Sequence, residues 1–182
     1  PCRSPQQMFG AVIREYYRNP EINQGKKLVS VSIMPCTAKK EEILRPESMT
    51  NGRQDVDYVL TFEELQGMFE AKQIDFDTVE EQDYLNEGTS AGRGFAVSGG
   101  VAKAVTDLVH EQYPDMEIQT ARAEGLRECR KLMMLAKAGK FKGCLLEGMA
   151  CPGGCVAGAG TMQPINKSKA SVGLYAKQAQ HQ

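Results

Sequence analysis

The chain has 182 residues and a formal net charge of −1, with 22 Lys and Arg against 23 Asp and Glu. This length suits one domain or a large lobe of one, and it leaves ample chain for a hydrophobic core. Because neither charge sign forms a long run, binding to nucleic acid or to a membrane surface is disfavoured. No apolar stretch approaches the span of a bilayer and no leader-like segment opens the chain, so we expect a cytoplasmic protein. Since the chain starts at Pro1, without Met and at the entrance to a helix, we also expect it to be an internal fragment of a longer protein.

The first half of the chain alternates helix and strand patterns. Ser4-Pro5-Gln6-Gln7 combines an N-cap serine, a proline at the first helical position and a capping-box glutamine. Thr61-Phe62-Glu63-Glu64 is a second capping box. Two short strand-like runs lie between these helix starts. We therefore predict helices from Ser4 to about Asn19 and from Thr61 to about Gln73, with strands over residues 28–33 and 56–60.

The second half begins with an acidic, glycine-containing stretch, residues 75–93, which we predict to be a loop or short connecting pieces. The patterns beyond it predict helices over residues 98–111 and 124–138 and strands over residues 116–121 and 141–146. Strands that alternate with helices indicate an α/β fold: a mostly parallel β-sheet of about four strands, flanked by helices on both faces. Ligands in such folds gather at the carboxyl ends of strands.

The six cysteines differ in their surroundings. Nothing marks the chain as secreted, and intracellular thiols usually stay reduced, so disulfides are not expected. Cys129 and Cys144 fall within apolar helix and strand patterns, and we interpret them as core residues. Cys2 lies near the end of the chain and is uninformative. The three candidate metal ligands that remain are Cys36, Cys151 and Cys155.

Met34-Pro35-Cys36 follows the strand predicted over residues 28–33 and allows two interpretations. Cys36 can be a buried cysteine that precedes a charged, solvated helix start. It can also be a metal ligand at a strand end, because thiolates favour soft metals and iron-sulfur clusters. In the second case one helical turn brings Lys39 back to the same side. Its ammonium group could then donate hydrogen bonds to an anionic ligand.

Cys151-Pro152-Gly153-Gly154-Cys155 is the more specific signal. If the segment is helical, the two sulfur atoms lie about one turn apart and face one object, and Pro152 suits the first helical position. Gly153 and Gly154 destabilise a helix interior, and we interpret them as allowing the backbone to approach a bulky group. The alternative is a reduced, glycine-rich loop with incidental cysteines. A structural zinc or dithiol module is disfavoured because a tetrahedral zinc site would lack its fourth ligand.

Both cysteine segments resemble signature motifs of one family. The stretches Met34 to Glu42 and Glu147 to Cys155 closely resemble the second and third motifs of the iron-only, di-iron hydrogenases, which reduce protons or oxidise hydrogen. Ser4–Gln7 and Ser98–Val101 also resemble segments of that family's catalytic domain. The resemblance spans nearly the whole chain. Residues 1–182 are therefore identified as the carboxyl-terminal lobe of a two-lobed hydrogenase catalytic domain, of the kind that serves hydrogen metabolism in anaerobes.

The resemblance implies a cofactor and roles for named residues. The family's cofactor is a 4Fe-4S cubane joined to a di-iron unit that carries CO, cyanide and a bridging dithiolate. The match makes Cys36 and Cys151 cubane ligands and Cys155 the bridging ligand. It makes Lys39 a catalytic-site residue that holds a cyanide of the di-iron unit. The remaining residues that would line the pocket are Gln6, Met34, Pro35 and Met149.

Two departures from the family pattern affect this interpretation. The first family motif, which reads Thr-Ser-Cys-Cys-Pro and supplies the fourth cubane ligand, does not occur in this chain. After Cys155 the family's run of three glycines is replaced by a variant stretch, residues 156–164, that points towards less characterised or sensory branches. The resemblance implies three partners: an N-terminal lobe of the same protein, a ferredoxin-like electron carrier or electron-transfer domain, and maturation machinery.

A second class of function is a hydrogenase-like protein that keeps an iron-sulfur cluster but has no di-iron unit, and that serves sensing or cluster assembly. Lys39 argues against this alternative at the level of sequence, because without cyanide the lysine has no evident buried partner. We expect the chain on its own to be inactive, since a cubane needs four ligands and only three matching cysteines are present.

Overall fold

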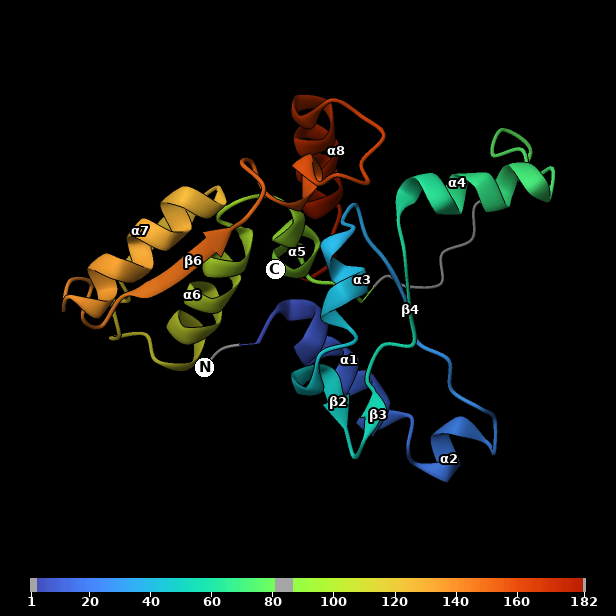
Figure 1. Cartoon of the computed structure of the whole chain (residues 1–182), viewed down its shortest axis with the longest axis horizontal. Helices are drawn as coiled ribbons and strands as arrows, with labels where there is room; N and C mark the ends of the chain where they lie inside the picture. The colour runs from blue at the N-terminus through green and yellow to red at the C-terminus, as the bar shows by residue number, and fades with distance from the viewer. Residues whose placement is uncertain (1–2, 81–86, 182) are drawn as a thin grey trace. The chain divides into compact units, whose positions relative to one another are not determined.

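The computed structural model of the protein describes residues 3–80 and 87–181. It divides into two compact units. Unit 1 comprises Pro1–Val79 with Ala159–Met162, and unit 2 comprises Glu80–Gly158 with Gln163–Gln182. The chain therefore passes between the units three times, and each unit is described by itself (Figure 1).

Unit 1 contains four α-helices, one 3-10 helix and four short strands among its described residues. In chain order they are α1 Pro5–Tyr16, α2 Pro20–Asn23, β1 Val31–Ile33, α3 Ala38–Glu42, η1 Pro46–Ser48, β2 Met49–Thr50, β3 Arg53–Gln54, β4 Tyr58–Leu60 and α4 Phe62–Ala71.

The two predicted capping boxes are confirmed. In α1 the Ser4 hydroxyl accepts a hydrogen bond from the Gln7 amide at 3.2 Å, and the Gln7 side chain accepts one from the Ser4 amide at 3.1 Å. Thr61 and Glu64 make the same reciprocal pair at the start of α4. The helix α1 ends three residues before the predicted boundary. Pro20 opens α2 and disfavours a helical conformation at the residue before it.

A parallel strand pair and a small apolar cluster form the centre of unit 1. Strand β1 pairs with β4 in the register Val31 to Tyr58 and Ile33 to Leu60. The buried cluster consists of Ile43, Val56 and Val59, with Met34 packed against it. Helix α1 approaches closely at Gly10, where an added Cβ would lie 2.7 Å from Val56 Cγ2.

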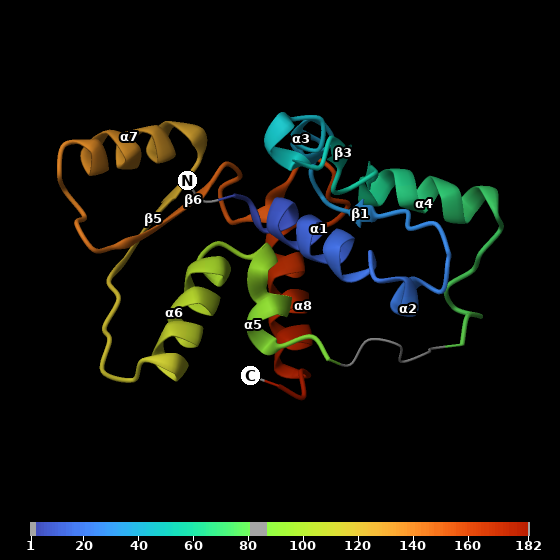
Figure 2. The ribbon, with the colours of Figure 1, turned by 90° about the horizontal axis from the view of Figure 1, so that it is seen from below.

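Unit 2 contains a second parallel pair with helices on both faces. Its elements in chain order are α5 Ser90–Arg93, η2 Gly94–Ala96, α6 Gly100–Gln112, β5 Thr120–Glu124, α7 Leu126–Lys137, β6 Leu145–Met149, η3 Cys155–Ala157 and α8 Ile165–Lys177. Strand β5 pairs with β6 from Thr120 opposite Leu145 to Glu124 opposite Met149. Helices α7 and α6 lie on opposite sides of this pair in both views (Figures 1 and 2).

The predicted α/β class is confirmed, and the four predicted strands form two parallel pairs, one in each unit, rather than one continuous sheet of the described residues. Strand β6 starts later than predicted because Phe141 and Gly143 adopt positive φ in a turn. Helix α8 was not predicted. Its sequence lacks a clear apolar period, and its N-cap residue, Pro164, has no side chain that can cap.

Residues 90–93 of the predicted connecting stretch are helical, in α5, and η2 follows directly after the stretch. Residues 81–86 of that stretch lie outside the described residues. None of the helices in the part of the chain that the structure describes has the length and apolar character needed to cross a bilayer.

Candidate metal centre

The first cysteine segment follows β1 in unit 1, as predicted. The Met34 amide donates to the Leu60 carbonyl at 2.8 Å, which continues the pairing of β1 with β4 by one residue. Pro35 is buried and Cys36 is a half-buried free thiol. Helix α3 starts two residues later. Cys36 therefore lies in the short connection between a strand end and a helix start.

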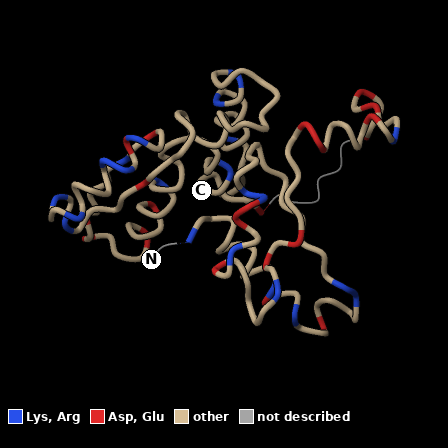
Figure 3. Tube along the Cα trace, viewed as in Figure 1, with Lys and Arg blue, Asp and Glu red and all other residues tan. Residues whose placement is uncertain are grey.

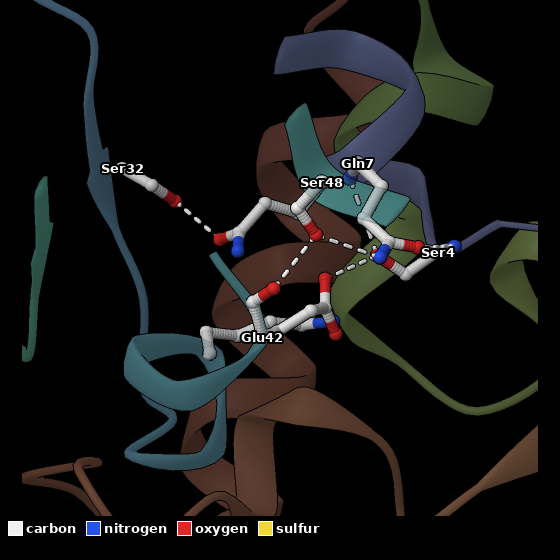
Figure 4. Close-up of polar contacts among 7 residues, drawn as sticks. Ser4, Gln7, Ser32, Glu42 and Ser48 are labelled. Carbon is white, nitrogen blue, oxygen red and sulfur yellow. Dashed lines mark hydrogen bonds and ion pairs between the residues drawn. The ribbon is translucent and has the colours of Figure 1, made fainter. Parts of the chain in front are cut away.

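Lys39 has a partner within unit 1, so the expectation that it has no buried partner without cyanide is wrong. Its ammonium group contacts the Glu42 carboxylate at 2.5 Å, and the two side chains are only 18% and 14% exposed. The other oxygen of Glu42 accepts a hydrogen bond from the Ser4 hydroxyl at 2.5 Å (Figure 4). The sequence alone shows no buried partner for Lys39 apart from cyanide, because the burial of Glu42 cannot be seen from a charge run.

Helix α1 is tied to the same segment by a second set of hydrogen bonds. The Gln7 side-chain amide donates to the Ser48 hydroxyl at 2.8 Å, and that hydroxyl donates to the Glu42 carbonyl at 2.7 Å (Figure 4). The start of α1, the end of α3 and η1 thus form one polar network around Glu42. This network limits the movement of the helix that carries Lys39.

Gln6 presents a buried donor in unit 1. Its side chain is 7% exposed. Its Oε1 accepts a hydrogen bond from the Ser32 hydroxyl at 2.7 Å, so Nε2 is the donor end of the amide. Within the described residues Nε2 has no hydrogen-bond partner. A buried donor without an acceptor is costly, and it suits a site that receives a polar group.

The second cysteine segment, in unit 2, is a turn rather than the predicted helical start. The Gly154 amide donates to the Cys151 carbonyl at 3.0 Å, and Gly153 and Gly154 have φ of 99° and 97°. Positive φ is incompatible with a right-handed helix, so the helical placement of the two sulfur atoms is wrong. The short helix η3 begins only at Cys155. Cys151 and Cys155 are both half-buried.

Gly154 permits a close approach between two stretches of backbone. A Cβ on Gly154 would lie 2.5 Å from the Ser98 amide nitrogen and 2.7 Å from the Ala96 carbonyl oxygen. The Ser98 amide donates to the Gly153 carbonyl at 3.2 Å. Gly154 is therefore required twice, for its φ and for this packing.

Glu124 fixes the cysteine turn from the end of β5, and the sequence analysis missed it. Its carboxylate accepts a hydrogen bond from the Gly153 amide at 2.7 Å. The Ser98 hydroxyl, the Gly153 amide and the positive charge of Lys169 favour the ionised form, so the pKa of the Glu124 carboxyl lies below its ordinary value. In the sequence-based prediction the strand ended at residue 121 and a helix began at Glu124. Glu124 was therefore not recognised as a residue at a strand end that could bond to the cysteine turn.

Glu147 is a second missed residue, in β6. It is 7% exposed, and its carboxylate accepts hydrogen bonds from the Gly99 amide at 2.6 Å and the Ala102 amide at 3.1 Å. It thereby satisfies free amides at the N-terminus of α6, where a negative charge is favoured. Glu147 is the first residue of the second stretch that resembles a family motif. Its capping role was not predicted, because the sequence around a carboxylate in a strand does not show which helix the carboxylate will contact.

The candidate ligands are divided between the two units, with Cys36 in unit 1 and Cys151 and Cys155 in unit 2. Across residues 3–80 and 87–181, no three His, Cys, Asp or Glu side chains are grouped to hold a metal ion. The convergence of the three thiols on one cluster therefore stays a prediction. Met34 packs in the core of unit 1, and Met149 is half-buried at the end of β6.

In α/β folds, ligands commonly bind beyond the carboxyl ends of the strands, which is where both cysteine segments of this chain lie. Comparison with known families makes the class specific. Residues 1–159 match the family model described as the iron only hydrogenase large subunit, C-terminal domain. The chain belongs to this family.

Named relatives fall into two groups. The chain is 36% identical to the NADP-reducing hydrogenase subunit HndD of Solidesulfovibrio fructosivorans, over 87% of this chain and 32% of that protein. It is 33% identical to the periplasmic Fe hydrogenase large subunit of Nitratidesulfovibrio vulgaris, over 90% and 45%. It is also 27% identical to the cytosolic iron-sulfur assembly component 3 of Pongo abelii, over 89% and 41%.

Solved structures show the same fold. A variant of the FeFe-hydrogenase HydA1 from Chlamydomonas reinhardtii matches 94% of this chain and 59% of its own, with a TM-score of 0.67 and 23% identity. The chain spans only about a third to a half of the curated relatives' length.

Proposed function

We propose that the chain is part of a di-iron hydrogenase that catalyses reversible H2 oxidation and proton reduction at an iron-sulfur-linked di-iron cluster. The observation that carries the proposal is the buried Gln6 Nε2, a donor without a partner among the described residues, in the unit that also holds Cys36 and Lys39. A ligand such as cyanide carries negative charge and needs buried donors. Membership of the hydrogenase family supports the same conclusion.

The residues of this chain fit such a cofactor in part. Cys36 and Cys151 would bind the cubane and Cys155 would bridge it to the di-iron unit, while the fourth cubane ligand would come from sequence outside residues 1–182. When bound, the cluster would supply the redox centre at which hydrogen is formed or split.

The other candidate residues would shape the pocket. Lys39 and Gln6 would donate hydrogen bonds to polar cofactor ligands. The side chains that would form a dry wall are Met34, Pro35 and Met149.

We propose the same partners as the resemblance implies: an N-terminal lobe of the same protein, a ferredoxin-like electron carrier or electron-transfer domain, and maturation machinery. A cytoplasmic location is part of the proposal. One named relative is periplasmic, so the location needs its own test. Sequencing of the complete gene would show whether an export signal is encoded, and fractionation of the host cell would show where the protein is found.

A second candidate function is an iron-sulfur protein for sensing or cluster assembly without a di-iron unit. The ion pair of Lys39 with Glu42 favours this candidate, because the lysine is already satisfied without cyanide. Relatives named as assembly components support it as well.

Infrared spectroscopy of the matured full-length protein distinguishes the two functions, because metal-bound CO and cyanide absorb where protein does not. We expect these bands in the wild type. Lys39→Met should leave the cubane absorbance nearly intact but weaken retention of the di-iron unit, since a charge-assisted hydrogen bond contributes about 1.5 to 3 kcal/mol.

The matched control is Lys40→Met, because Lys40 lies in the same helix but pairs with the exposed Glu64. It should retain both signals. Absence of CO and cyanide bands in the wild type would favour the assembly or sensing function.

The 182-residue chain alone should show no hydrogenase activity, since it offers three of four cubane ligands. The measurement is hydrogen evolution with reduced viologen after anaerobic cluster reconstitution and maturation. Robust turnover by the isolated chain would show that the missing motif is dispensable.

A further inference from the structure

Lysine is the only charged residue type in α8, and one of its lysines lies over the second cysteine segment. The helix contains Lys167, Lys169 and Lys177 and no acidic residue. Figure 3 shows α8 with positive charge only. Lys167 and Lys177 are exposed, whereas Lys169 is half-buried. A half-buried charge is screened less than an exposed one, so Lys169 acts more strongly on its surroundings than the other two lysines.

The end of the Lys169 side chain covers the middle of the cysteine turn, residues 151–155. A Cβ added to Gly153 would lie 3.2 Å from Lys169 Nζ and 3.3 Å from Lys169 Cε. These separations are tighter than ordinary van der Waals contact, so the lysine occupies space that a larger residue at position 153 would need. The ammonium group therefore lies beside the residue midway between Cys151 and Cys155.

This ammonium group has no ion-pair partner of its own. Within residues 3–80 and 87–181, no Asp or Glu oxygen lies within 4 Å of Lys169 Nζ. The pKa of the Glu124 carboxyl is lowered by the Ser98 hydroxyl, by the Gly153 amide and, at longer range, by the charge of Lys169. An ammonium group without a directly bonded anion can stabilise further negative charge near the turn.

Without Lys169 the surroundings of the turn would be dominated by negative charge. The Glu124 carboxylate accepts a hydrogen bond from the Gly153 amide at 2.7 Å. Cysteines that bind a metal do so as thiolates, so Glu124 is a like charge beside the two candidate ligands. The charge of Lys169 offsets that of Glu124. Arg122 is the other cation that acts on Glu124, but its side chain is exposed and its effect is smaller.

We propose that Lys169 is a fixed positive charge that raises the reduction potential of the cubane held by the Cys151 segment. Reduction adds one negative charge to the cubane, so a nearby cation stabilises the reduced state more than the oxidised state. Net charge is one of the features by which a protein sets the potential of an iron-sulfur cluster. This role rests on the proposed function, because it requires Cys151 and Cys155 to bind the cluster.

The test uses the full-length protein loaded with its iron-sulfur clusters but not exposed to the maturation machinery, so that the cubane is present without the di-iron unit. Electron paramagnetic resonance during a redox titration measures the ratio of reduced to oxidised cubane. Lys169→Met removes the charge and keeps most of the side-chain volume. Lys167→Met, two residues away in the same helix, removes an exposed charge and is the matched control.

We expect Lys169→Met to lower the ratio of reduced to oxidised cubane about tenfold at a fixed potential, which corresponds to about 59 mV for one electron. Lys169→Arg keeps the charge and should restore the ratio to within about twofold of the wild type. Lys167→Met should also stay within about twofold, because the charge it removes is screened. Glu124→Gln removes a negative charge and should shift the ratio in the opposite direction.

An equal ratio in Lys169→Met and the wild type would overturn the proposal. A shift of the same sign in Lys169→Met and Glu124→Gln would also overturn it, because a loosened turn, unlike a changed charge, gives no dependence on the sign of the charge removed. Infrared spectra of the matured protein test the proposed function separately. Absence of CO and cyanide bands would refute the hydrogenase function alone, since the cubane titration needs no di-iron unit.

Discussion

The two cysteine segments are held in place by different kinds of contact. In unit 1 the helix after Cys36 is fixed by side chains, through the ion pair of Lys39 with Glu42 and the hydrogen bond from Ser4. In unit 2 the Cys151 turn is fixed through its backbone, which bonds to Glu124 and to Ser98. The side chains around Glu42 have other rotamers available if one member is removed, whereas any residue larger than glycine at position 154 meets both an unfavourable φ and nearby backbone. We therefore expect the second segment to be the more sensitive to substitution.

The largest effect is expected for Gly154→Ala. The turn would force alanine to adopt a positive φ, which residues with a Cβ rarely do, and the new Cβ would lie 2.5 Å from the Ser98 amide nitrogen. Together these two effects should lower the free energy of unfolding by about 3 kcal/mol or more. Gly143→Ala is the control. Its φ is also positive, but an added Cβ would meet no described atom within 4 Å, so only about 1 to 2 kcal/mol should be lost. Urea denaturation measures both; equal losses would contradict the close packing of Gly154.

Glu147→Gln is expected to have the next largest effect. It replaces a buried carboxylate that accepts from two amides of α6 with a neutral amide that can keep one good acceptor. The loss should be about 1.5 to 3 kcal/mol, with faster hydrogen exchange in the first turn of α6. Glu111→Gln, at the exposed far end of the same helix, should change neither quantity. Unaltered exchange in the Glu147 variant would show that the cap is not needed.

A double-mutant cycle on Lys39→Met and Glu42→Gln should give a coupling energy of about 1 kcal/mol, since the pair is mostly but not fully buried. The reference is the same cycle on Lys40 and Glu64, whose side chains are 40% and 47% exposed, and which should couple more weakly. Thermal or urea unfolding of the four variants measures each cycle. A larger coupling in the exposed pair would contradict the view that the Lys39–Glu42 ion pair helps to fix α3.

The smallest effect concerns acid pH. The nearby Ser98 hydroxyl and the Gly153 amide lower the pKa of Glu124 from 4.5, and hydrogen bonding by Lys40 and Thr61 lowers that of Glu64 from 4.5. A carboxyl with a lowered folded pKa adds stability above its unfolded pKa, and that stability is lost as pH falls through the folded value. Glu124→Gln and Glu64→Gln should therefore each flatten the fall in stability below about pH 4.5. Urea midpoints across this range measure the slope; a steeper fall in either variant would contradict the sign.

Local signals in the sequence identified most elements and both cysteine segments. A capping box is a contact between residues three apart, so Ser4 with Gln7 and Thr61 with Glu64 were predictable. The carboxylates that hold the segments were not. Glu42, Glu124 and Glu147 bond to groups 38, 29 and 48 residues away, and such partners are set by the tertiary fold. The glycine turn was misassigned because Pro152 at a helix start and glycine in a tight turn are both common, and only φ separates them.

The path of the chain constrains how the units could be produced separately. Residues 159–162 belong to unit 1, while the chain on either side of them belongs to unit 2. Within unit 1 the Gly160 amide donates to the Pro35 carbonyl at 3.2 Å, next to Cys36, and Gly160 packs against Thr61. A protein truncated after Val79 would leave that carbonyl without its donor and the Thr61 surface uncovered. To produce unit 1 alone, residues 159–162 must therefore be joined to its carboxyl end by a short linker. A single proteolytic cut near residue 158 would not separate the two units, because residues 163–182 of unit 2 would stay attached to residues 159–162.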